Sequence, residues 1–233
     1  MAETAERADA GIRALRRSPA AHLAEDFAQG SVAGSRGVTL REVPFLTMVG
    51  LRVDPASAAG QRLGAVVGGL PAGCGQVGGA SDGGRVDRSG VDGSGVDGAG
   101  DGTGTLWLGP QEFLVVAPED VSGDGGPAAL VLALQEALGQ DAGQAVDLSA
   151  NRTTFELTGP SARAVLEKSC SLDLHPRAFA PGTAYVTEIG LIPALLWKLD
   201  AETFLIFPRA SFADFLGRWL LDGMQEFNAV QVP

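Results

Sequence analysis

Three polar side chains close together in the sequence hold the residue types best suited to chemistry. Asp173, His175 and Arg177 lie within a single five-residue stretch. A histidine oriented by a carboxylate can act as a general base, so a catalytic pair of His175 and Asp173 is one interpretation. In the alternative, Asp173 caps a turn while His175 and Arg177 contact a neighbouring chain. No nucleophile or cofactor motif lies nearby, and we therefore favour the contact role.

Signatures of the common enzyme classes do not occur in the sequence. There is no G-x-S-x-G nucleophile elbow, no Walker loop, and no G-x-G-x-x-G between a strand and a helix. The two cysteines, Cys74 and Cys170, lack metal-ligand spacing, and a lone histidine such as His22 is usually structural. We therefore expect no catalytic residue, no cofactor site and no metal site on this chain.

Composition and charge narrow the class of protein further. The chain has 233 residues, of which 45% are hydrophobic, enough for a sizeable core in one large domain or two small ones. Its net charge is −11, and an acidic chain repels nucleic-acid phosphates. No apolar run is long enough for a membrane span, and the start lacks the apolar core of a secretory signal. We expect a cytoplasmic protein that binds neither nucleic acid nor membrane.

A strand and a helix should position the polar cluster. Residues 152–158 alternate as a half-buried strand does, and Gly159-Pro160 ends it. A helix over 161–169 should turn Ala162, Val165 and Leu166 inward. The irregular segment 170–182 follows.

Apolar residues in that segment should hold it down and leave its polar residues free. Leu172, Leu174 and Phe179 are the apolar ones. Such a mixture is typical of recognition loops. The predicted partner-binding residues are Asp173, His175, Arg177, Phe179 and, from the preceding strand, Arg152.

Hydrophobic periodicity predicts strands and helices along the rest of the chain. Expected strands are 38–43, 45–53, a hairpin over 105–117, 145–148, 183–190, 191–199 and 203–207. Expected helices are 56–67, starting near Ser57, then 127–138, and a final helix from Ser211. Ser211 and Asp214 fit a capping box. In the final helix, a stripe at helical spacing should face the core: Phe212, Phe215, Leu216, Trp219 and Leu220.

This order predicts an α+β fold of two similar strand–helix–strand–strand–helix modules packed together. Residues 38–143 form the first module and 144–233 the second. Leu106-Trp107 and Leu196-Trp197 are part of the internal similarity. Residues 1–37 should be an N-terminal arm, either docked on an acidic partner through its arginines or frayed.

A glycine-rich insert at 71–104 interrupts the first module. It contains the tandem repeats VDRSG, VDGSG and VDGAG, which place Asp87, Asp92 and Asp97 at a regular spacing. The spacing fits neither an EF-hand loop nor a calcium β-roll. We expect a disordered polar loop, since such a segment cannot bury enough apolar area to offset its backbone entropy.

Several motifs resemble a known family. The segment NRTTFELTGPSARAVLEKSCSLDLHPRAF is similar to the gamma subunit of heterotetrameric sarcosine oxidase, as are LREVPFLTMVGLRVDP, LWLGPQEFLVVAP and SFADFLGRWLLDG. The strand, L-x-G-P-x-A and helix also resemble the folate-binding fold of glycine-cleavage aminomethyltransferases. This resemblance implies an aminomethyltransferase folate-binding-like architecture.

The resemblance implies a small non-catalytic subunit of a complex that oxidatively demethylates sarcosine to glycine and passes the methyl carbon to tetrahydrofolate. FAD, FMN, NAD and tetrahydrofolate would be bound by the larger subunits, and the partners would be the alpha (largest), beta and delta subunits. The alternative is a free-standing folate-binding or aminomethyltransferase-like protein. Against it, residues 190–194 lack the acid that those transferases carry in the similar segment. A regulatory binding module outside one-carbon metabolism is a third possibility.

Overall fold

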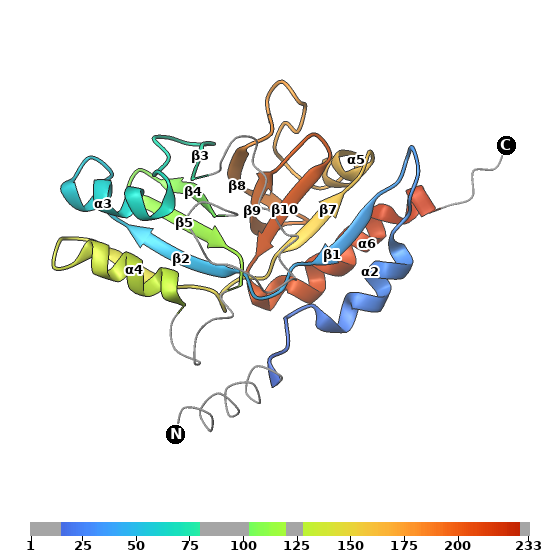
Figure 1. The fold of residues 1–233 in the computed structure, drawn as a ribbon. Coiled ribbons are helices and arrows are strands. Elements are labelled where there is room, and N and C mark those ends of the chain that lie inside the picture. Colours follow the sequence, from blue (N-terminus) through green and yellow to red (C-terminus); the bar gives the residue numbers. More distant parts are fainter. Residues whose placement is uncertain (1–14, 80–102, 120–127, 229–233) are drawn as a thin grey trace.

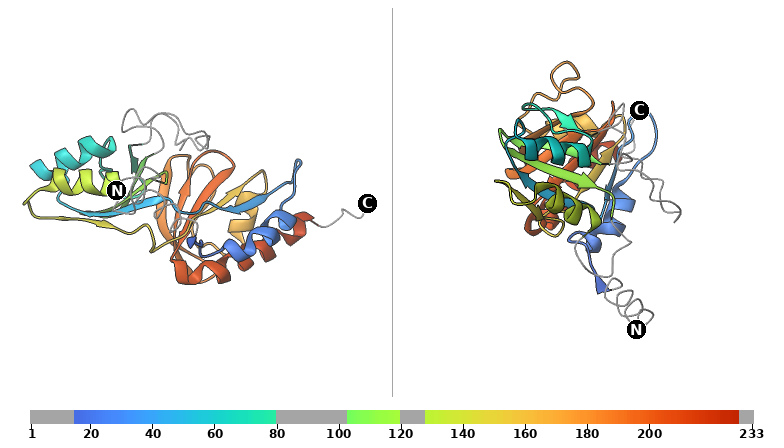
Figure 2. Two further views of the ribbon diagram at one scale, coloured as in Figure 1. Left: turned by 60° about the horizontal axis from the view of Figure 1, so that its bottom comes forward. Right: turned by 60° about the vertical axis from the view of Figure 1, so that its left-hand side comes forward.

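The computed structural model describes residues 15–79, 103–119 and 128–228, which form two five-stranded antiparallel sheets (Figure 1). The first sheet has the order β3-β4-β5-β2-β6, and the second has β1-β7-β10-β9-β8. Helices cover one face of each sheet, and the sheets lie side by side in an elongated molecule (Figure 2). This arrangement confirms the predicted α+β class.

The elements of the first sheet lie mainly in the first half of the chain. Its strands are β2 (Thr47–Arg52), β3 (Val77–Gly78), β4 (Gly104–Gly109), β5 (Glu112–Ala117) and β6 (Gln144–Asp147), and its helices are α3 (Ala58–Val67) and α4 (Ala129–Leu138). As predicted, α3 starts after Ser57, whose hydroxyl accepts a hydrogen bond from the Gly60 N–H at 3.0 Å. It ends at Gly68, where φ is +76° and only glycine is unstrained.

The second sheet carries the remaining elements. Its strands are β1 (Thr39–Glu42), β7 (Phe155–Thr158), β8 (Thr183–Ile189), β9 (Ile192–Lys198) and β10 (Thr203–Pro208). Its helices are η1 (Ala21–Leu23), α2 (Ala24–Gly30), α5 (Ala162–Glu167), η2 (Ala210–Phe212) and α6 (Ala213–Asn228). Within the described ranges, no helix is both long and apolar enough to cross a lipid bilayer.

The two sheets exchange a strand. β1 pairs with β7 of the second sheet, although the next strand, β2, belongs to the first. In return, β6 pairs with β2, and the chain then enters β7. The two connections run side by side (Figure 1), and between them the Val43 N–H donates to the Thr154 carbonyl at 2.8 Å. Each sheet is therefore built from both sides of the predicted boundary at 143–144.

The two sheets match strand for strand. In the order along each sheet, β3, β4, β5, β2 and β6 correspond to β8, β9, β10, β7 and β1. The Leu-Trp repeat lies on corresponding strands, but Trp107 packs beneath α3 and α4, whereas Trp197 lies in the core between the sheets. Because successive residues of a strand face opposite sides of the sheet, the Leu-Trp pair of β9 is shifted by one position relative to that of β4 when the two sheets are compared.

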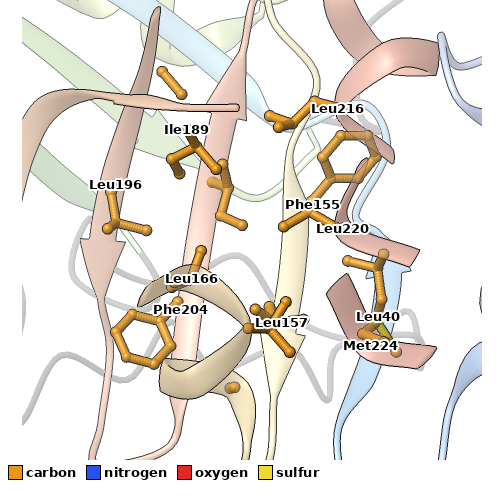
Figure 3. Packing of buried hydrophobic residues seen from close by; sticks show 14 of the residues in the cluster. Leu40, Phe155, Leu157, Leu166, Ile189, Leu196, Phe204, Leu216, Leu220 and Met224 are labelled. Carbon is orange, nitrogen blue, oxygen red and sulfur yellow. The ribbon is translucent and has the colours of Figure 1, made fainter. Parts of the chain in front are cut away.

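The largest apolar core lies between the second sheet and its helices (Figure 3). Phe155, Leu157 and Phe204 of the strands lie in one cluster with Leu216 and Leu220 of α6. Each of these side chains is at most 1% exposed. As predicted, Ala162, Val165 and Leu166 of α5 also face this core, so α5 is fixed just before residues 170–182 begin.

Residues 18–37 of the predicted arm are packed on the second sheet. Leu23 and Phe27 are buried, and the Phe27 ring meets Phe155 edge-on at 5.7 Å. The Glu42 carboxylate ties this segment down by accepting hydrogen bonds from Ser18 Oγ, the Ala20 N–H and Thr153 Oγ1. A frayed terminus is therefore wrong for this segment, because its apolar side chains complete the core.

Arginine 16, part of the predicted basic arm, interacts with its own chain. Its guanidinium pairs with Glu119 at 2.7 Å and lies 4.0 Å from the centre of the Phe45 ring. Arg13, with the rest of residues 1–14, lies outside the described residues.

The glycine-rich insert begins later than predicted. Residues 71–79 are ordered, and Val77 and Gly78 form β3 against β4. The Gly75 carbonyl accepts a hydrogen bond from the Ala184 N–H of β8 at 3.1 Å, and a β-carbon on Gly75 would come within 2.6 Å of the Tyr185 hydroxyl. This stretch therefore bridges the two sheets. Residues 80–102, with all three aspartate repeats, lie outside the described residues.

The predicted core stripe of the last helix is only half right. Leu216 and Leu220 are buried, but Phe212, Phe215 and Trp219 are 38%, 47% and 44% exposed. The side of α6 that faces the core carries Ala213, Leu216, Leu220 and Met224, and the aromatic side chains lie outside this buried side. The expected capping box also differs, since Ser211 lies within η2 and the Asp214 carboxylate interacts with His22 and Arg218.

Candidate partner-binding surface

Residues 173–179 form a compact turn held by its own polar groups. The Asp173 carboxylate accepts a hydrogen bond from the His175 backbone N–H at 2.9 Å. The His175 Nδ1 accepts one from the Arg177 N–H at 3.2 Å. The His175 carbonyl accepts from the N–H groups of Ala178 and Phe179 at 2.8 and 2.9 Å. This is an Asx-type turn followed by a single helical turn.

The arrangement does not assemble an acid–base pair. Asp173 binds the backbone of His175 rather than its imidazole, and Nδ1 is occupied by the Arg177 amide. All three side chains are exposed, and within the described ranges Asp173 and Arg177 form no ion pair with each other. Asp173 thus has the turn-capping role of the structural alternative, and the outer parts of His175 and Arg177 face solvent.

Two apolar side chains anchor the turn, as the sequence predicts. Leu174 and Phe179 are each 1% exposed. The Phe179 ring lies 5.8 Å from the Tyr185 ring and 6.2 Å from that of Phe204. Phe179 was also a predicted contact residue, but this depth makes it a support for the turn.

A buried lysine that sequence reasoning missed also supports the turn. Lys198 is 1% exposed, and its Nζ donates a hydrogen bond to the Phe179 carbonyl at 2.9 Å. The ammonium lies 5.5 Å from the centre of the Phe204 ring. Burial, and secondarily the charge of Arg163, lower the pKa of Lys198, while Asp200 partly opposes them. The available signal was a single charge in the otherwise apolar stretch 191–199.

Arg152, the other predicted contact residue, is tied into the fold. Its Nη1 donates to the Phe207 carbonyl at 2.8 Å. Partial burial, followed by repulsion from Arg209, lowers the pKa of Arg152. Arg209 in turn donates to the Asn151 side chain at 2.8 Å. These contacts brace the connection from β6 to β7, away from the turn at 173–179.

Sequence reasoning missed a second surface, the aromatic patch, formed by Phe212 at the end of η2, Phe215 and Trp219 of α6, and Leu191 of the β8–β9 hairpin. The Phe215 and Trp219 rings stack at 5.9 Å with an angle of 20° between their planes. The Trp219 indole lies over Gly190, where a β-carbon would come within 3.1 Å of three ring atoms. Leu191, the next residue, is 86% exposed. Helical spacing in the sequence revealed the apolar stripe of the last helix, but it did not show which residues of that stripe the core would bury.

A polar cluster lies at the start of α6. The Asp214 carboxylate accepts hydrogen bonds from His22 Nε2 at 2.6 Å and Arg218 Nε at 3.0 Å. The hydrogen bond with His22, more than the Arg218 contacts, lowers the pKa of Asp214. His22 therefore joins the N-terminal segment to α6, which agrees with the structural role expected for it.

In the part of the chain that the structure describes, no three His, Cys, Asp or Glu residues come together in a possible metal site. Cys74 and Cys170 are free thiols.

Comparison with known proteins gives one consistent family. The model of the sarcosine oxidase, gamma subunit family matches residues 96–226. Sarcosine oxidase subunit gamma of Corynebacterium sp. (strain U-96) is 47% identical over 219 residues, which cover 94% of each chain. Its counterpart from Arthrobacter sp. is 46% identical over the same share of both chains.

Solved structures give the same result for the fold. A chain of the heterotetrameric sarcosine oxidase from Corynebacterium sp. U-96, in complex with pyrrole 2-carboxylate, matches with a TM-score of 0.79 and 46% identity. The match covers 94% of this chain and 100% of that one. The glycine cleavage system aminomethyltransferase T from Bartonella henselae matches at a TM-score of 0.58 with 16% identity, over 89% of this chain and 57% of that one. The second likeness concerns the fold alone and confirms the predicted aminomethyltransferase-like architecture.

Proposed function

The chain belongs to the sarcosine oxidase gamma subunit family, and we propose that it serves its heterotetrameric enzyme as a non-catalytic structural subunit. The main observation in favour of a non-catalytic role is that the Asp173 carboxylate accepts its hydrogen bond from the His175 backbone N–H and not from the imidazole. A general base needs its imidazole oriented and its nitrogen free toward a substrate, and here Nδ1 is occupied by a backbone amide.

The chemistry of the complex would then belong to the larger subunits. In this proposal they bind FAD, FMN and NAD, oxidise sarcosine to glycine, and transfer the methyl carbon to tetrahydrofolate. Support comes from family membership and from the lack of dinucleotide and nucleophile motifs in the sequence. The two free thiols agree with the cytoplasmic location that we propose for the complex.

The gamma chain would bind mainly to the alpha subunit, the largest, in a complex that also contains beta and delta. The turn at 173–179 is one proposed contact, through His175 and Arg177. Both are exposed, while Phe179 and Lys198 hold the turn from below. Because the backbone of the turn is already fixed, binding needs little further ordering of the main chain, which favours a contribution of Arg177 to affinity.

Co-expression with the other subunits tests this function. The four chains should co-purify as one flavoprotein, and omission of the gamma chain should reduce the yield or stability of the remaining complex. The gamma chain purified by itself should show no flavin absorbance. Bound flavin on the isolated chain would contradict the non-catalytic role, and failure to co-purify with any flavoprotein subunit would contradict the proposal as a whole.

A further inference from the structure

We propose that the aromatic patch is a docking surface for a larger subunit of the complex, which covers it with an apolar pocket edged by a basic side chain. The inference rests on the proposed function, because it takes the occupant to be a subunit of the same enzyme. It adds a contact on α6 and the β8–β9 hairpin, separate from the turn at 173–179.

The exposed apolar residues are unevenly distributed. Among the described residues, the most exposed phenylalanine and tryptophan side chains all lie on this patch: Phe212, Phe215 and Trp219. Leu191, beside them, is the most exposed large hydrophobic residue at 86%. Aromatic residues are enriched in the centres of protein interfaces, and a cluster of this kind marks an interaction site more often than scattered apolar residues do.

The backbone of the hairpin gives an independent reason. Gly190 and Leu191 form a two-residue turn with φ values of +58° and +66°. Such a turn favours Asn, Asp or Gly, and leucine is disfavoured at positive φ because its β-carbon crowds the backbone. Leu191 therefore strains the turn without burying its side chain in this chain. A pocket on a partner subunit would supply the burial that the fold does not.

The charged residues beside the aromatic patch indicate which side chains should surround the pocket on the partner subunit. Asp222 is exposed on α6 one turn beyond Trp219, and its carboxylate forms no hydrogen bond or ion pair with the side chains of other described residues. The nearby acids differ, since Asp214 is held by His22 and Arg218 and Glu226 pairs with Lys168. Asp222 is thus available to a lysine or arginine on the partner. A second copy of this chain fits less well, because each copy carries a net charge of −11 and brings its own Asp222 rather than a free basic side chain to the contact.

Two substitutions separate docking from folding. Leu191→Asn removes the apolar side chain and places a residue that tolerates positive φ, so the melting temperature of the gamma chain should stay the same or rise. Its affinity for the assembled remaining subunits should nevertheless fall at least tenfold. Phe215→Gln should weaken binding similarly, and Leu132→Gln is the matched control because Leu132 is 51% exposed on α4, outside the patch.

Affinity would be measured by interferometry with the remaining subunits immobilised, alongside thermal melts and sedimentation of each gamma variant. Binding of both patch variants with wild-type affinity would overturn this inference and leave the proposed function standing. Loss of self-association in the variants, with unchanged heterotetramer, would also overturn it in favour of a homodimer surface. If wild-type gamma chain fails to bind, the proposed function and this inference are both wrong.

Discussion

The ammonium group of Lys198 donates a hydrogen bond to the carbonyl oxygen of Phe179, 2.9 Å away, and both residues are 1% exposed. This hydrogen bond connects strand β9 to the turn that contains His175 and Arg177. A buried carbonyl that loses its donor costs about 1–3 kcal/mol, so this single contact is significant for the order of the turn.

Lys198→Met should loosen the turn while the sheet stays intact. Methionine preserves the length and apolar stem of the side chain but offers no donor to Phe179. Amides in residues 177–182 should exchange with deuterium at least several-fold faster, while those of β9 and β10 keep their protection. Lys168→Met, which removes an exposed lysine of the same module, is the control. Unchanged exchange in the turn would show that Leu174 and the Phe179 ring hold it without Lys198.

The same substitution should alter the dependence of stability on pH. The pKa of Lys198 is lower in the folded chain than its ordinary value of 10.5. Between the two values the unfolded chain binds more protons, so the free energy of unfolding contributed by this group rises as pH increases toward 10.5. In Lys198→Met this rise should be absent, which denaturant titrations between pH 7 and pH 10 can measure. Parallel curves for the two proteins would contradict a lowered pKa.

His175→Ala combined with Arg177→Ala should weaken binding to the larger subunits without destabilising the gamma chain. Both side chains are exposed, and the turn keeps its Asp173 cap and its buried anchors. The one internal contact that is lost, from the Arg177 N–H to the His175 Nδ1, is exposed, so water can replace it. If the two residues lie at the centre of the interface, truncation of each should cost about 2 kcal/mol or more of binding free energy. Pull-down titrations with paired thermal melts provide the measurement. A markedly lower melting temperature would mean that the pair supports the fold instead.

The effect of deleting the insert on the melting temperature should depend sharply on where the deletion starts. Removal of residues 81–101 should change the melting temperature little, since closure entropy varies slowly with loop length. A deletion that starts at Gly75 also removes β3 and the Gly75–Ala184 hydrogen bond, and should lower the melting temperature by several degrees. Equal melting temperatures for the two deletions would show that β3 contributes nothing to stability.

Glu42→Gln should release the N-terminal segment from β1. The Glu42 carboxylate accepts hydrogen bonds from Ser18, Ala20 and Thr153, and charged acceptors contribute about 1.5–3 kcal/mol each. We expect a loss of about 2 kcal/mol in unfolding free energy and easier proteolysis before η1. Glu202→Gln, an exposed acid in the β9–β10 turn, is the control. Equal losses in both variants would point to net charge as the cause.

Local signals in the sequence were sufficient for most elements. The Ser57 cap, the hairpin of β4 and β5, and the inner stripe of α5 are decided by neighbours within a few residues, and all three were predicted correctly. The outward orientation of Trp219 was not, because periodicity defines a stripe on a helix and not the elements that cover it. Lys198 was missed for a related reason, since its acceptor lies 19 positions away.

The exchange of β1 and β6 was also beyond local patterns, and it sets the order in which the protein can form. Thr39 bonds to the Thr158 carbonyl, 119 positions later in the chain. As the protein emerges from the ribosome, β1 leaves the tunnel first, but its partner strand β7 appears only after all five strands of the first sheet. The first sheet, in turn, lacks its edge strand until β6 has been synthesised. Neither half can therefore finish folding before the chain is well past its midpoint, and a break between α4 and β6 should leave two fragments that fold only together.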